Sequence, residues 1–100
     1  LVHVGDVTLS PLVFDLEHHQ AQRIQLAQTS EREFEVRIQL AEAADAGLVF
    51  QTVTEAVKRV FREHGLNDVT VRESQAELEF SASGKFQEVL PLRAPVRETR

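Results

Sequence analysis

Strict alternation of apolar and polar side chains over residues 33–40 constrains the fold of this chain more than any other feature. The apolar members are Phe34, Val36, Ile38 and Leu40. A period of two is typical of a strand with one face on the core and one face in water. Residues 22–28 alternate in the same way, beyond a short polar turn at 29–32. The pattern predicts an antiparallel hairpin whose glutamines and charges form a solvated face.

An amphipathic helix predicted over residues 48–64 is the counterpart of this apolar strand face. Its stripe consists of Leu48, Val49, Val53, Val57, Val60 and Phe61, with charged side chains on the other side. Either Asp45 caps the start of the helix, or Thr52 does, with Glu55 at capping-box spacing. Gly65 is expected to end it. The stripe predicts that this helix covers the apolar face of the hairpin.

The N-terminal residues predict two smaller elements. Residues 1–9 read as a β-hairpin around a two-residue turn at Gly5 and Asp6. Ser10 followed by Pro11 is typical of a helix start, and we expect about two turns that end near residue 18.

Short strands are predicted after the long helix, and the whole chain reads as one domain. The expected strands are at residues 69–71, 76–80 and 89–90, and residues 93–100 are expected to be a frayed tail. Strands segregated from helices predict an α+β fold over residues 1–100. We expect a small, mostly antiparallel sheet with two helices packed on it.

Composition excludes several classes of protein. The chain has 100 residues, 42% of them hydrophobic and 27% charged, as in an ordinary globular domain. Its formal net charge of −5 argues against nucleic-acid binding. No apolar run is long enough for a membrane span or a signal peptide, so we expect a cytoplasmic protein without membrane contact.

The sequence offers no pattern for a structural metal. There is no cysteine, which excludes a disulfide framework and a thiolate site. His18 and His19 are adjacent and would not face one another on a helix, while His3 and His64 have no acidic or histidine partner at ligand spacing. We therefore expect solvated or partly buried histidines.

The polar stretch Ser81–Val89 places a lysine at the junction between a small loop and a short apolar run. Gly84 adopts positive φ at little cost, so the backbone is expected to turn there and to project Lys85 from the tip. A lysine on such a tip suits contact with a phosphate or carboxylate of another body. From spacing alone, a plain hairpin with a solvated lysine is the favoured interpretation.

The segment Ser83–Val89 resembles the end of an acyl-adenylate-forming enzyme, where a Gly-Lys pair closes the small C-terminal lid domain. The nearest branch is the phenylacetate–CoA ligase-like group, and the resemblance extends over most of the chain. Phe80 stands where the family usually has proline, and Glu88 where arginine commonly follows the lysine.

The resemblance implies roles for four residues. Lys85 would be the catalytic lysine of adenylate formation, with Gly84 beside it at the cofactor. Gly5 and Asp6 would match the turn after the inter-domain hinge, which approaches the pantetheine channel during the thioester step. ATP, CoA and a carboxylic acid would be the ligands, with Mg²⁺ held by a large N-terminal domain of the same enzyme. Since the chain starts at Leu1, we expect a piece of that enzyme which is inactive alone.

The alternative is a protein of another class, a free-standing α+β regulatory or dimerisation module without catalysis. Exposed sheet edges would then pair with a second copy of the chain to form a homodimer. The sequence upstream of Leu1 separates the two hypotheses, because only a lid would follow a large domain with a Ser/Thr/Gly-rich phosphate loop.

Overall fold

A computed structural model describes residues 1–92 of the chain, and the tail predicted at 93–100 lies outside these described residues. The elements are β1 (Val2–Val4), β2 (Val7–Leu9), the 3₁₀ turn η1 (Pro11–Val13), β3 (Ala21–Ser30), β4 (Glu33–Leu40), α1 (Ala46–Glu63), β5 (Thr70–Ser74) and β6 (Val89–Leu90). The first hairpin, the long strand pair, the helix and the last strand therefore form close to their predicted positions.

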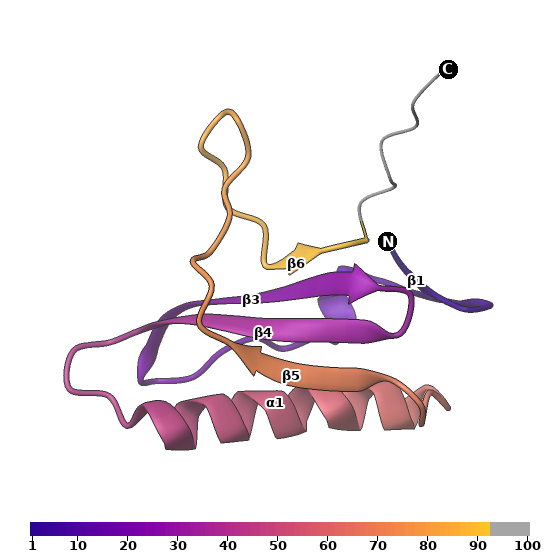
Figure 1. The fold of residues 1–100 in the computed structure, drawn as a ribbon, viewed down its shortest axis with the longest axis horizontal. Helices are drawn as coiled ribbons and strands as arrows, with labels where there is room; N and C mark the ends of the chain where they lie inside the picture. Colours follow the sequence, from indigo (N-terminus) through magenta and orange to yellow (C-terminus); the bar gives the residue numbers. More distant parts are fainter. Residues whose placement is uncertain (93–100) are drawn as a thin grey trace.

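An antiparallel pair stands at the centre of the main sheet, whose strand order is β5-β4-β3-β6 (Figure 1). In this pair Leu26 lies opposite Val36, and Ile24 lies opposite Ile38. β5 joins β4 in parallel, and β6 joins β3 in parallel. A parallel neighbour needs a long crossover, which α1 provides between β4 and β5. The predicted α+β class is confirmed, and the structure adds parallel edges to the antiparallel centre.

The core lies between α1 and one face of this sheet. Figure 1 shows α1 running alongside β5 and β4. The Phe61 ring of α1 has its centroid 4.7 Å from that of Phe34 in β4 and 5.3 Å from that of Phe14. The fully or nearly buried members of the predicted core are Phe34, Val36, Val53, Val57 and Phe61. The predicted members Ile38, Leu40 and Val60 are only partly buried at its margin.

The N-terminal segment covers the rest of the same sheet face. Its buried side chains are Val2, Val4, Leu9, Phe14 and Leu16. Ser10 caps η1 as predicted, because its side chain accepts a hydrogen bond from the Leu12 amide at 3.2 Å. The expected two-turn helix is wrong, however, since helical structure ends at Val13. Residues 14–17 alternate between buried and exposed, so only an extended backbone turns both Phe14 and Leu16 inward.

Both ends of α1 are capped by side-chain and backbone groups. Asp45 is the N-cap, with Oδ1 accepting from the Leu48 amide at 3.1 Å, so the alternative start at Thr52 is wrong. At the other end the Leu66 amide donates to the Phe61 carbonyl at 2.8 Å, and the Gly65 amide donates to Arg62 at 3.0 Å. This pair of bonds is a Schellman motif, which confirms the predicted role of Gly65.

Val57→Asp tests the assignment of the core. Val57 is 2% exposed, so the new carboxylate would be buried without a partner. We expect the free energy of unfolding to fall by about 3 kcal/mol or more, measured by urea denaturation. Gln51→Asp, at an exposed position of the same helix, is the control and should stay within about 0.5 kcal/mol of the parent chain. Unchanged stability of Val57→Asp would contradict the core described above.

Candidate functional site

The Gly-Lys turn forms a closed loop that is held by its own hydrogen bonds. The Ser81 amide donates to the Lys85 carbonyl at 2.8 Å, and the Gly84 amide donates to the Ser81 carbonyl at 2.8 Å. The Lys85 amide donates to Ser81 Oγ at 3.0 Å. Phe80 and Phe86 face each other in an antiparallel bridge at the base. We call residues 80–86 the lysine loop.

Gly84 provides the turn that the sequence predicts. Its φ is +85°, in the region that L residues with a side chain rarely adopt. A Cβ at this position would have no other atom within 4 Å, so lack of space does not explain the glycine. Backbone conformation alone therefore selects glycine before Lys85.

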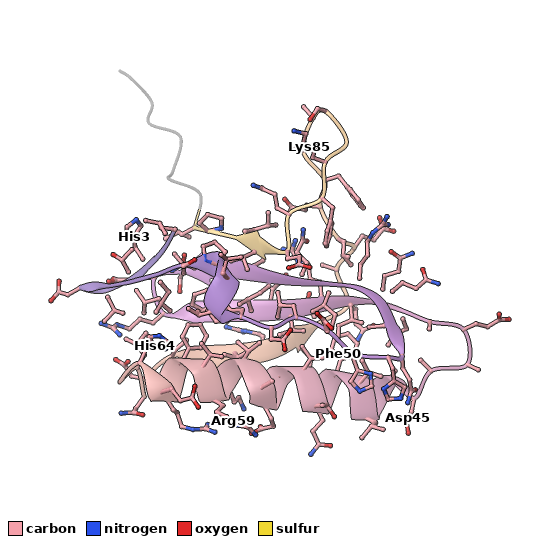
Figure 2. The ribbon with its side chains drawn as sticks, turned by 180° about the vertical axis from the view of Figure 1, so that it is seen from behind. His3, Asp45, Phe50, Arg59, His64 and Lys85 are labelled. Carbon is pink, nitrogen blue, oxygen red and sulfur yellow. The ribbon has the colours of Figure 1, made fainter. Side chains whose placement is uncertain are left out.

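Lys85 stands exposed near the tip of this loop, as predicted. Figure 2 shows the lysine loop rising on the side of the sheet away from α1, with Lys85 far from Arg59 on the outer side of that helix. Within residues 1–92, no carboxylate forms an ion pair with Lys85. The ammonium group is therefore presented to solvent on a backbone that is already closed.

The strand predicted at residues 76–80 does not form. Residues 75–79 have no regular secondary structure, and Phe80 contributes only the bridge to Phe86. This segment instead crosses the face of the main sheet that lies opposite α1. The backbone amide and carbonyl of Glu79 bond to the side chain of Gln25 in β3 rather than to a neighbouring strand. A period-two pattern predicts an extended chain, and the extended chain here lies on the sheet instead of joining it.

The prediction of a solvated polar face is wrong at the centre of the sheet. Gln25 is 0% exposed and Arg37 is 9% exposed. The two residues are cross-strand partners on β3 and β4, and the segment 75–88 lies over them. The signal that sequence reasoning missed is the apolar content of that segment, Leu78, Phe80 and Phe86, which requires a surface to pack on.

Arg37 is the centre of a charge network on this face. Its Nε donates to Glu35 at 2.8 Å, and its Nη1 donates to Glu79 at 3.2 Å. Nη1 also donates to Gln25 Oε1 at 3.3 Å. Glu79 precedes the lysine loop directly, so this network ties the start of the loop to the sheet. The buried guanidinium is stabilised because its charge is paired and its Nε and Nη1 groups donate hydrogen bonds.

Arg23 makes a second contact with the base of the lysine loop. Its guanidinium lies 5.4 Å from the Phe80 ring centroid and 5.7 Å from the Phe86 centroid. The two rings are themselves 5.4 Å apart. Such cation–π contacts stabilise by about 0.5–1 kcal/mol at exposed sites, enough to favour one ring arrangement.

The predicted turn at Gly5 and Asp6 forms, but it lies away from Lys85. Gly5 has φ +59° at the tip of the β1–β2 hairpin. Figure 1 places this hairpin at the opposite end of the sheet from the lysine loop, and Figure 2 shows His3 of β1 well apart from Lys85. The structure therefore brings Gly84 and Lys85 together, but not Gly5 and Asp6 with them.

A cavity of about 760 Å³ opens beside the descending limb of the lysine loop. Its lining includes His18, His19, Arg23, Phe86 and Glu88. The two imidazole rings stack with centroids 4.6 Å apart, and His18 Nδ1 accepts from the Gln20 amide at 3.0 Å. The lining mixes acidic side chains such as Glu88 with basic ones such as Arg23. This geometry favours no particular ligand.

Over residues 1–92, no group of three or more His, Asp or Glu side chains is placed to hold a metal ion. Within the same residues, no helix has the length and apolar character needed to cross a membrane.

Metal removal is expected to leave the fold unchanged, because structural metal sites need a converging set of ligands. The melting temperature should be the same with and without a strong chelator, measured by circular dichroism. The same chelator, saturated with zinc before it is added, is the control, because it changes the ionic strength without removing metal from the protein. A large drop that only the free chelator produces would show that a metal stabilises this chain.

Comparison with known proteins gives no match, since no family model, no curated protein and no solved structure is significantly similar to this chain. A functional assignment therefore rests on the residues and geometry described above.

Proposed function

We propose that this chain is the C-terminal lid domain of an ATP-dependent carboxylic acid–CoA ligase of the acyl-adenylate-forming kind. The observation that carries the proposal is the exposed Lys85 on a closed loop, preceded by a glycine with φ +85°. A lid must offer a cation to a site on another domain. A lysine that is unpaired within the described residues and fixed at its backbone meets that requirement.

Lys85 would act in the first half-reaction. Attack of the substrate carboxylate on the α-phosphate of ATP expels pyrophosphate and builds negative charge in the transition state. The ammonium of Lys85 would stabilise that charge, as a preorganised cation does in a site closed to water. The large domain of the enzyme would hold ATP, Mg²⁺ and the acid.

The charges around the lysine loop suit this role. Residues 81–87 contain no acidic side chain, so the loop itself adds no repulsion toward a phosphate. Glu79, just before the loop, is paired with Arg37 at 3.2 Å. Arg37 is shared between Glu79 and Glu35, so it offsets part of the negative charge that precedes the loop.

Phe80 occupies the position where the family usually has proline. In this chain its ring packs against Phe86 and under the guanidinium of Arg23. A proline restricts the backbone by its ring. Here the aromatic pair restrains the base of the loop by packing, so the departure from the family pattern does not leave the turn unsupported.

The proposal assigns Gly5 and Asp6 to the second half-reaction, after rotation of the lid. Two sites on different ends of one small domain suit two orientations of that domain against the same substrate. Figure 1 places the hairpin and the lysine loop at different ends of the sheet, which supports this division.

The dimerisation module has less support. β5 is the longer of the two edge strands of the main sheet, yet it is only five residues long and carries Arg72 and Glu73. Short length and charged side chains are features by which proteins keep an edge strand from pairing with another chain.

Lys85→Ala tests the proposal in the full enzyme that carries this lid. Loss of one preorganised contact to a developing charge lowers rates by on the order of 10²–10³. We expect that loss in adenylate formation, measured by pyrophosphate exchange. Thioester formation from supplied acyl-adenylate should be spared, because it uses the rotated lid. Lys85→Arg should restore little activity, since a planar guanidinium does not replace a slender point charge.

Lys58→Ala is the matched control, because Lys58 and Lys85 are the two lysines of the chain and Lys58 lies on α1. It should leave both half-reactions unchanged. Both variants should keep the free energy of unfolding within about 0.5 kcal/mol of the parent. Equal losses in both half-reactions of Lys85→Ala would indicate a folding defect. Full activity in both would exclude the lid assignment.

A further inference from the structure

Gln25 is a fully buried amide that joins the two limbs of the lysine loop. It lies in β3 with 0% of its surface exposed. Its Nε2 donates to the carbonyl of Glu79 at 2.9 Å and to the carbonyl of Gln87 at 2.9 Å. Its Oε1 accepts from the Glu79 amide at 2.9 Å. Glu79 lies directly before the loop and Gln87 directly after it, so one side chain bridges both of its ends.

The amide has no hydrogen-bonding capacity left over. A glutamine side chain offers two donor hydrogens and two acceptor lone pairs. Both donors are used on the two carbonyls, and both acceptor positions are used by the Glu79 amide and by Arg37 Nη1 at 3.3 Å. Complete use of a buried amide is what offsets the free-energy cost of burying it.

Arg37 fixes the orientation of this amide. A flipped amide would turn its NH₂ group toward the Arg37 guanidinium and its oxygen toward two carbonyls. Both contacts would be repulsive. Arg37 is itself held by Glu35 at 2.8 Å and by Glu79 at 3.2 Å. The sheet therefore presents Gln25 in one orientation only.

Few backbone hydrogen bonds hold the two limbs of the loop to each other or to the sheet. The two limbs meet as paired backbone at the single bridge between Phe80 and Phe86, and the hydrogen bonds at Ser81 close the loop internally without tying it to the sheet. The Leu26 amide donates to the Glu88 carbonyl at 2.8 Å, which ties only the descending limb to β3. Arg23 also lies near a ring from each limb, but Gln25 is the side chain of β3 that joins the backbones of both limbs by hydrogen bonds.

We infer that Gln25 is a positioning residue, which sets where the lysine loop stands over the sheet and therefore where Lys85 is presented. It acts through the backbone of Glu79 and Gln87 and need not touch a substrate. Its effect on loop orientation is independent of any activity. Its effect on adenylate formation rests on the proposed function.

The chain contains a matched control three residues further along β3. Gln28 is 6% exposed, and its Nε2 also donates to two carbonyls, those of His3 at 2.9 Å and Glu31 at 3.1 Å. Its Oε1 accepts from the Leu92 amide at 2.9 Å. Gln28 thus repeats the chemistry of Gln25, but these hydrogen bonds go to residues outside the lysine loop and its limbs.

The first experiment compares Gln25→Met with Gln28→Met in this chain. Methionine keeps an unbranched side chain of similar length and removes the amide. Residual dipolar couplings of the Ser81, Gly84 and Lys85 amides report loop orientation relative to β3 and β4. We expect these couplings to lose most of their magnitude in Gln25→Met and to match the parent in Gln28→Met. Both variants should lose stability, so stability alone does not distinguish them.

Gln25→Glu provides a second test should Gln25→Met not fold. Ionised glutamate keeps the shape of the side chain and its acceptor toward Arg37, but it has no donor for the carbonyls of Glu79 and Gln87. We expect the same loss of loop couplings. Couplings that match the parent in a folded Gln25 variant would overturn the positioning role.

The second experiment uses the full enzyme. Misplacement of a reacting group by about 1 Å can lower rates by on the order of 10²-fold. Because Gln25→Met keeps the ammonium group that Lys85→Ala removes, it should lower kcat of adenylate formation by less than Lys85→Ala does. KM for ATP and thioester formation from supplied acyl-adenylate should be unchanged. Loss of the loop couplings in Gln25→Met, together with full adenylation activity in Lys85→Ala, would support the positioning role and exclude the lid function. Loop couplings that match the parent in Gln25→Met, together with loss of adenylation in Lys85→Ala, would exclude the positioning role and support the lid function.

Discussion

Burial of β3 on both of its faces is the constraint on which the rest of this structure depends. Residues 24–28 are all buried, although they alternate between the two sides of the sheet. One side is covered by α1 and the N-terminal segment, and the other by the chain after β5. A strand covered on two sides needs three layers. In a chain of this size the third layer is an irregular segment rather than a second helix.

The two covers are specified by different interactions. On the α1 side, close packing of rings such as Phe34 and Phe61 supplies apolar burial, which depends on area and tolerates small shifts. On the other side, Gln25 and Arg37 are buried, and such groups are stable only with their hydrogen bonds made. Because those bonds are directional, they determine the position of the covering segment more narrowly than apolar contact would.

That division suits the function we propose. A lid lysine must stand exposed, so it contributes little to its own placement. The rigidity of the lysine loop therefore has to come from the residues that lie under it, and in this chain those residues are buried and polar. Gln25 and Arg37 hold the limbs, Arg23 restrains the two rings at the base, and Lys85 is left without an ion pair among the described residues. The cation is thereby presented on a fixed backbone.

Patterns local in the sequence determined much of this protein. Alternation over residues 33–40, the helical stripe from Val49 to Phe61, and the glycines at 65 and 84 each predicted an element that forms, because periodicity and backbone preference act over a few residues. Tertiary structure alone decided whether the polar strand face is buried and whether residues 75–80 join the sheet as a strand. Whether Gln25 faces water or a carbonyl depends on a segment more than fifty residues away. Period-two alternation is the same for a chain that joins a sheet and one that lies across it, so only the assembled layers distinguish the two.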